Sequence, residues 1–179
     1  MPLFKKSRVE QLVKAKDVAG LIALITGPDP ARERADAAHE LPRFAEEIEA
    51  RHRDAAHAAL TRAAQDPDAE VRSSALFALS ELGWDDAVEH LLAGAKDSEW
   101  VVRMFAVTML GRFPGERVAS VLGTVLADDP EGMVREASAS ALGDLGVPGG
   151  LESLRRAAEE DPDREVRKAA ESALKRLGK

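Results

Sequence analysis

The sequence predicts an all-α superhelix, a solenoid of about five helical hairpins plus an unpaired C-terminal helix. The first observation behind this prediction is a Val-Arg pair that recurs at intervals of 31, 32 and 32 residues, beginning at Val71, Val102, Val134 and Val166. The second is that small or apolar residues follow each Val at the fourth and eighth positions, which share one side of a helix. The third is composition, because aromatic residues make up only 4% of the chain, which disfavours sheets.

Each regular unit has acidic residues at its start and a glycine near the end of its first helix. Asp stands five residues before every Val, and Asp or Glu stands three residues before it. Asp66, Asp129 and Asp161 precede Pro, so we expect these carboxylates to cap the first helix of each hairpin. The first helices are expected to end at Gly83, Gly111, Gly143 and Gly178. The second helices are expected over residues 85–95, 116–126 and 150–159.

The chain before residue 66 departs from this register. A short capping hairpin is expected first, with helices over residues 8–16 and 18–26. In the next repeat Glu33 replaces the Val, Pro42 ends the first helix, and an elongated second helix follows. The chain ends on a helix over residues 163–177 that has no second helix to cover it. We expect a single repeat domain over residues 1–179, made of the capping hairpin, the divergent longer repeat and the regular repeats, over residues 7–26, 29–65 and 66–179.

The regular units resemble a known family. Runs such as DPDAEVRSSALFAL and DPDREVRKAAESAL are similar to the short HEAT repeats of the phycobilin-lyase type. The resemblance implies an α-α solenoid, and in solenoids of this kind the second helices line the inner, concave surface. It does not select a function, because such repeats occur in chromophore-lyase subunits, a di-iron hydroxylase, DNA glycosylases and adaptors.

Composition limits the class of protein. The net charge of -7 argues against a nucleic-acid binder, because affinity for phosphate backbones comes from clustered Lys and Arg. The absence of Cys excludes disulfides and Cys-ligated metals. No apolar run reaches the roughly 18 residues of a membrane span, and residues 1–17 lack the apolar segment of a secretory signal. We therefore expect a cytoplasmic protein that binds neither nucleic acid nor membrane.

Neither a catalytic residue nor a cofactor is predicted. Deoxyhypusine hydroxylases, a related HEAT-repeat group, carry His-Glu pairs directly after the Val-Arg, where they bind iron. The corresponding pairs in this chain are Ala35-Asp36, Ser73-Ser74, Met104-Phe105, Glu136-Ala137 and Lys168-Ala169. Asp54 and His57 share a helix face, but His52 and His57 lie roughly 140 degrees apart around a helix. We therefore expect no bound metal, and surface or packing roles for the histidines.

The second helices form one of two surfaces that are candidates for binding a protein partner. Aligned side by side, they present mostly small residues, which would let the backbone of a partner approach closely. The polar side chains expected in this concave groove are His57, Glu89, His90 and Arg156.

The other candidate is a convex patch on the helix over residues 99–111, which is apolar nearly all round. Trp100, Met104 and Val107 lie opposite its core stripe, and Leu76 and Phe77 on the preceding helix would extend the patch. Exposed apolar patches mark interaction sites, and Trp is a favoured anchor. The alternative is that these side chains belong to the ordinary core.

The arginine that follows each repeated Val is predicted to have a structural role. We predict a structural ladder of Arg-carboxylate pairs between units, formed by Arg72, Arg103, Arg135 and Arg167. The whole sequence predicts a non-enzymatic protein-binding scaffold or adaptor, with a homodimer through the unpaired last helix as an open question. Two alternatives remain: an accessory subunit of an enzyme such as a chromophore lyase, and an acidic inhibitor or immunity-type protein.

Overall fold

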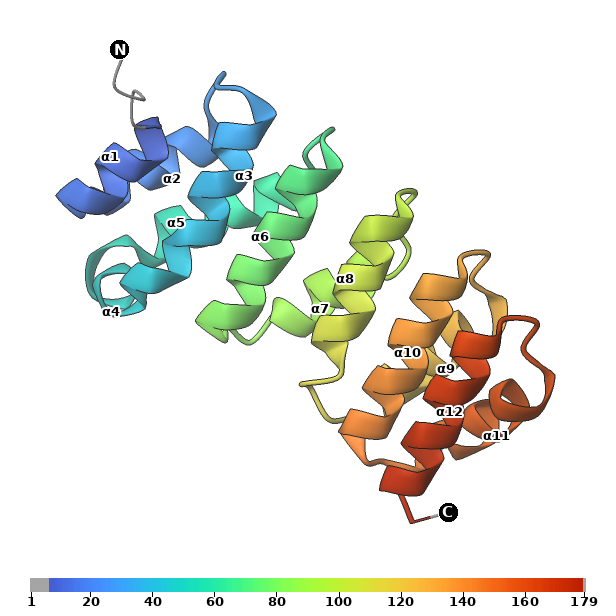
Figure 1. Ribbon diagram of the computed structural model, residues 1–179. Coiled ribbons are helices and arrows are strands. Elements are labelled where there is room, and N and C mark those ends of the chain that lie inside the picture. The colour runs from blue at the N-terminus through green and yellow to red at the C-terminus, as the bar shows by residue number, and fades with distance from the viewer. Residues whose placement is uncertain (1–6, 179) are drawn as a thin grey trace. The chain divides into compact units, whose positions relative to one another are not determined.

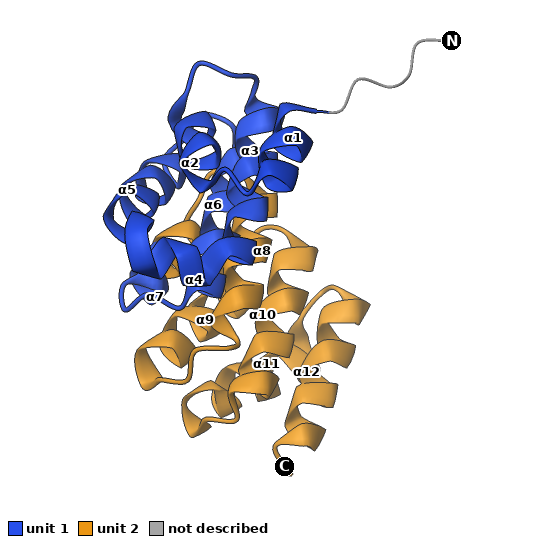
Figure 2. Ribbon diagram, turned by 90° about the vertical axis from the view of Figure 1, so that its left-hand side faces the viewer, with its two compact units in different colours: residues 1–90 blue, residues 91–179 orange. Residues whose placement is uncertain are grey.

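The computed structural model describes residues 7–178, and these residues form helices and turns without a strand (Figure 1). Helices pack in hairpins, so the predicted all-α solenoid is confirmed. None of the described helices is long and apolar enough to cross a membrane. The chain divides into two compact units, residues 1–90 and 91–179, and the division falls inside helix α7 (Ala87–Gly94) (Figure 2).

Unit 1 has two layers. One layer holds the first helices of successive hairpins, in which α3 packs on both α1 and α6, and the other holds the second helices, in which α2 packs on α5. The α-helices that lie wholly in this unit are α1 (Arg8–Ala15), α2 (Val18–Thr26), α3 (Ala31–Glu40), α4 (Ala45–Glu47), α5 (Arg53–Ala63) and α6 (Ala69–Leu82).

Unit 2 repeats this arrangement. Helix α10 packs on α8 and α12 in the first layer, and α9 packs on α11 in the second. Its helices are α8 (Trp100–Leu110), α9 (Glu116–Asp128), α10 (Gly132–Leu145), the 3-10 helix η3 (Pro148–Gly150), α11 (Leu151–Glu160) and α12 (Arg164–Arg176).

The predicted apolar stripe forms the core between the layers. In α6 the stripe is Val71, Ala75 and Leu79, and each is fully buried. Burial of a Val or Leu side chain stabilises the fold by about 1.5 to 3 kcal/mol, so each repeat gains most from these positions. Ser138 takes the small position in α10 and is also fully buried, but its hydroxyl donates to the Leu122 carbonyl of α9 at 2.7 Å. This hydrogen bond removes the penalty of an unpaired buried hydroxyl.

The residue that caps a first helix lies two positions after the Asp of the Asp-Pro pair, which was predicted to be the cap. Asp68 and Asp163 are the N-cap residues, and their carboxylates accept from the backbone N–H groups of Glu70 and Glu165 at 2.9 and 2.8 Å. The Asp of the Asp-Pro pair instead accepts from the N–H two residues on, as Asp66 does from Asp68 at 2.9 Å. Such an Asx turn satisfies the carboxylate locally and delays the helix until the second acid.

One of the predicted helix ends, at Gly143, is also wrong. Gly83 does follow α6 with a left-handed φ of 65°, but α10 ends at Gly146, which has a φ of 67°. Gly143 lies inside α10, where a Cβ would stand 2.8 Å from the Ala173 Cβ of α12, so glycine permits close packing of the two helices. Gly111 follows α8 with an ordinary helical φ of -58°.

The elongated second helix of the divergent repeat is broken into segments. After α3 ends at Glu40, Pro42 lies in the 3-10 helix η1 (Leu41–Phe44). The chain then passes through α4 and the π-helix η2 (Ile48–His52) before α5 begins. The longer repeat thus contains a widened helical turn, as is typical of the single π-helical turns found inside α-helices.

Candidate functional site

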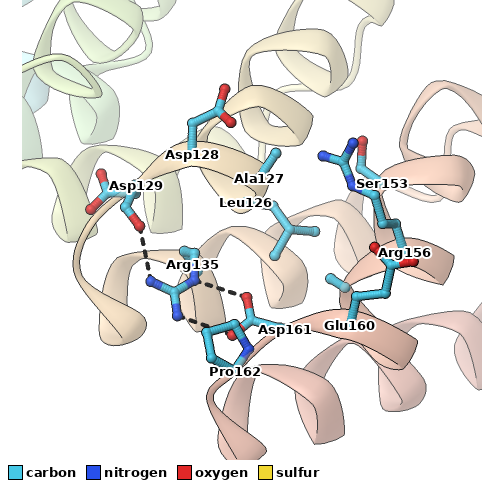
Figure 3. Close-up of a pocket in the computed structure, with 11 residues that line it drawn as sticks. Leu126, Ala127, Asp128, Asp129, Arg135, Ser153, Arg156, Glu160, Asp161 and Pro162 are labelled. Carbon is cyan, nitrogen blue, oxygen red and sulfur yellow. Dashed lines mark hydrogen bonds and ion pairs between the residues drawn. The ribbon is translucent and has the colours of Figure 1, made fainter.

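Bidentate ion pairs join the first helix of one repeat to the loop of the next. In unit 2, Nε and Nη2 of Arg103 donate to the Asp129 carboxylate at 2.7 and 3.0 Å. Arg135 donates in the same way to Asp161 at 2.8 and 3.0 Å, and Figure 3 shows it between that carboxylate and the Asp129 carbonyl. The predicted Arg-carboxylate pairing is therefore present at these two arginines.

A third pair of the same kind lies in unit 1 and was not among the predicted ladder residues. Arg34 donates through Nη2 and Nε to Asp66 at 2.7 and 3.1 Å. The sequence did indicate that Arg34 could form such a pair, because Arg34 aligns with Arg72 in the repeat. Glu33 stands where the regular units have Val. Arg72 and Arg167 bind the carbonyls of their own loops, and Nη1 of Arg72 donates to the Asp66 carbonyl at 2.9 Å.

The pairs change the acidity of the carboxylates that they hold. For Asp161, burial raises the pKa, but the hydrogen bond from Arg135, the backbone N–H of Asp163 and the charge of Arg135 together lower it below the ordinary value of 3.8. Asp66 follows the same pattern with Arg34, and its pKa is also lowered. These guanidinium groups are occupied by carboxylates and carbonyls, so the ladder is not arranged as a phosphate site.

The described side chains do not form the predicted convex patch. Val107 and Leu76 are buried, at 0% and 2% exposure, and Phe77 is half-buried with its ring stacked on His39 at 4.5 Å between centroids. The prediction was wrong for Val107 and Leu76, which lie in first helices that pack on another first helix, α8 on α10 and α6 on α3. Ala139 occupies the position of Val107 in α10, between α8 and α12, and is buried as well.

An apolar pair at the start of two adjacent first helices was missed by the sequence analysis. Val101 is 42% exposed and Met133 is 56% exposed, and they are the exposed large hydrophobic residues among those described. Each directly precedes the repeated Val, in α8 and α10, which pack on each other. The other two regular units have Glu70 and Glu165 at this position. The replacement of Glu by an apolar residue in two units was the sequence feature that indicated the apolar pair. Two further members of the predicted patch, Trp100 and Met104, are half-buried. Trp100 directly precedes Val101 in the sequence.

The predicted groove residues fall into two groups. His57 on α5 and His90 on α7 meet in unit 1, with ring centroids 6.4 Å apart, and Glu89 beside them is exposed. Arg156 lies on α11 in unit 2, where it lines a cavity of about 500 Å³ together with Arg135, Ser153 and Asp161 (Figure 3). The cavity is lined largely by polar groups, and Arg135 and Asp161 in its lining pair with each other. The cavity is therefore suited to polar contacts rather than to an apolar ligand.

Asp86 joins the two histidines and was not predicted. Its Oδ2 atom lies 2.7 Å from Nε2 of His57 and 3.4 Å from Nε2 of His90. Burial raises the pKa of Asp86, but the hydrogen bond from His57 and the charges of His57 and His90 outweigh it, so the pKa falls below 3.8. We call His57, Asp86 and His90 the histidine cluster.

Comparison with known protein families identifies the repeats. The family model for HEAT repeats matches residues 18–104 and again residues 88–175. The chain belongs to the HEAT-repeat family. None of the curated proteins compared with this HEAT-repeat chain is significantly similar to it.

Solved structures share the fold of this HEAT-repeat chain. Human deoxyhypusine hydroxylase in complex with glycerol is 22% identical over 95% of this chain and 76% of its own, with a TM-score of 0.59. The complex of CpcE and CpcF of phycocyanin lyase from Nostoc is 24% identical over 89% of this chain and 64% of its own, with a TM-score of 0.69. A designed armadillo repeat protein is 20% identical over 94% and 85%, with a TM-score of 0.59.

Proposed function

We propose that this HEAT-repeat chain is a non-enzymatic scaffold or adaptor that holds a protein partner in the cytoplasm. The observation that carries the proposal is the apolar pair, because Val101 and Met133 are exposed at the same position of two packed helices. Single exposed apolar residues are ordinary on a protein surface. Two at equivalent positions, next to the half-buried Trp100, give a small apolar surface that includes an aromatic side chain of the kind favoured as an anchor.

The surroundings of the apolar pair indicate the chemistry of the partner. Glu99 and Glu131 are exposed at the N-caps of α8 and α10, and the whole chain carries a net charge of -7. An apolar centre with an acidic rim is complementary to an apolar segment flanked by Lys or Arg, since opposite charges accelerate encounter and exclude wrong partners. The proposed partner is therefore a protein with a basic surface around one or two apolar side chains.

The test is a double substitution, Val101→Glu with Met133→Glu. Glu occupies this position in α6 and α12, and an acid in the first turn suits a helix N-terminus, so both helices should still form. The partner captured by the tagged wild-type chain should bind the double variant at least about tenfold more weakly, as expected on loss of a hot spot. Circular dichroism should be unchanged.

The matched control adds two charges to exposed positions of the other layer, Ser120→Glu with Thr124→Glu on α9. This control should bind the captured partner as the wild type does. If the control loses the partner and the apolar-pair variant keeps it, the second helices form the binding surface instead. If the partner proves to be an enzyme subunit whose activity needs this chain, the accessory-subunit reading replaces the plain adaptor.

A further inference from the structure

We propose that the histidine cluster is a binding site for one divalent transition-metal ion of the zinc class. The three side chains come from two neighbouring helical segments of unit 1: His57 from α5, Asp86 from the turn before α7, and His90 from α7. Their ligand atoms, two imidazole nitrogens and one carboxylate oxygen, all lie within 4.8 Å of one another. The cluster lies on the second helices, and none of its members occupies a position directly after a Val-Arg pair.

The two separations between Asp86 and the histidines are near those that a metal ion imposes, and the two imidazole nitrogens lie within 4.8 Å of each other. Zinc binds nitrogen and oxygen ligands at about 2.0 to 2.2 Å in a tetrahedron, which places the ligand atoms roughly 3.4 Å apart. The distance between Nε2 of His90 and Oδ2 of Asp86 is 3.4 Å, and the His57 distance of 2.7 Å must widen slightly. The side chains of His57, His90 and Asp86 are 39%, 18% and 42% exposed, so small side-chain rotations can complete the geometry.

The chemistry of the three ligands selects the class of ion. Two imidazoles and a carboxylate are a set that zinc uses at sites with three protein ligands, and the fourth position stays open to water or to a group from another molecule. Calcium and magnesium prefer oxygen ligands only, so a site with two nitrogens disfavours them. An aspartate carboxylate is ionised at neutral pH, so Asp86 can serve as the oxygen ligand.

The surroundings hold the ligands in place before a metal ion binds. Asp86 and His90 are four residues apart, so both lie on the same face of the helical segment. The His57 ring packs against Trp84, with centroids 5.1 Å apart. Trp84 is 5% exposed, and its indole N–H donates to Glu49 at 2.7 Å. Supporting contacts of this kind orient the ligands of metal sites and contribute to their affinity.

The sequence predicts no metal at these residues, because within a single helix His52 and His57 do not share a face. His57 pairs with residues of the next repeat, 29 positions away for Asp86, and only the packing of α5 beside α7 brings them together. The competing explanation is a plain His-Asp ion pair that ties the two helices. Zinc should not stabilise a chain in which these residues form only an ion pair, so the addition of zinc distinguishes a metal site from an ion pair.

The test uses the full chain without an affinity tag and measures zinc binding by calorimetry and by the melting temperature. We expect one zinc ion per chain, a saturable rise in melting temperature, and no rise with magnesium. Visible absorption of bound Co²⁺ should show low-coordinate geometry. His90→Ala and Asp86→Asn should each weaken zinc binding by at least about tenfold, as is typical for loss of a contact that supports a metal.

The other two histidines provide the control. His39→Ala and His52→Ala remove the same side chain outside the histidine cluster, and both should bind zinc as the wild type does. Circular dichroism of the apo variants checks that each folds, and Asp86→Asn preserves the side-chain volume if His90→Ala proves unstable. Zinc affinity weaker than about 1 mM, or equal affinity in the cluster and control variants, would overturn the proposal.

Discussion

At the scale of single residues, the pair of Arg135 and Asp161 is, with Arg103 and Asp129, among the most buried ion pairs of the described chain. Its side chains are 11% and 6% exposed, and two hydrogen bonds of 2.8 and 3.0 Å join them. Removing only the arginine leaves a buried carboxylate without a counter-charge. Loss of one partner from a buried pair costs about 3 to 5 kcal/mol, whereas an exposed pair contributes about 1 kcal/mol or less.

Arg135→Leu should therefore lower the free energy of unfolding by about 3 kcal/mol, the lower end of that range, because the pair is not completely buried. Urea denaturation followed by circular dichroism measures the loss. Lys168→Leu is the control, since Lys168 is 49% exposed and pairs with Glu165 at the surface. Equal losses in the two variants would contradict the structural role assigned to the ladder.

The same pair predicts how stability depends on pH. The pKa of Asp161 is lower in the folded chain than its ordinary value of 3.8, so its contribution is complete above that value and disappears as the pH falls through the folded pKa. The difference in unfolding free energy between wild type and Asp161→Asn should be constant at neutral pH and shrink below pH 3.8. A difference that stays constant in stronger acid would contradict this assignment.

At the scale of elements, Gly143 decides how closely α10 and α12 pack. Alanine at this position would gain about 1 kcal/mol in helix propensity. A Cβ there would stand 2.8 Å from the Ala173 Cβ and 3.0 Å from its Cα, and overpacking of this kind costs about 1 to 3 kcal/mol. The clash involves backbone, which cannot rotate away, so the packing cost should exceed the gain.

Gly143→Ala should therefore destabilise the chain, by up to about 2 kcal/mol after the gain in propensity is subtracted. Thermal unfolding would show a lowered melting temperature. Gly115→Ala is a suitable control, because a Cβ there meets nothing within 4 Å and its φ of 165° is extended backbone. A higher melting temperature for Gly143→Ala would show that the two helices separate without cost.

The elements also show what sequence reasoning could and could not provide. The period of the Val-Arg pairs set the position of each first helix to within about two residues, because burial of one stripe permits only one register. The burial of Val107 was not predictable from one helix, since it depends on the packing around that helix. The histidine cluster was missed for the same reason, because it depends on contacts between repeats.

At the scale of the whole molecule, stability should be distributed over repeats. Each hairpin packs mainly on its neighbours, so the total is close to a sum of repeat and interface contributions. Deleting residues 147–179 removes α11 and α12 and leaves Arg135 without Asp161. The shortened chain should keep the helical circular dichroism of its remaining helices and melt at a lower temperature. Complete loss of helical signal would indicate one indivisible unit.

The direction of the ion pairs has a consequence for how such a chain can change in length. The bidentate pairs of Arg103 and Arg135 each run from an arginine in one repeat to the aspartate that opens the next, and these aspartates, Asp129 and Asp161, precede prolines. If a gene duplication inserted a second copy of residues 130–161 after Asp161, both junctions would again read Asp-Pro. The inserted arginine would find its own aspartate, and every earlier charge would keep its partner. Repeats of this kind can therefore be gained or lost in whole units without leaving a buried charge alone.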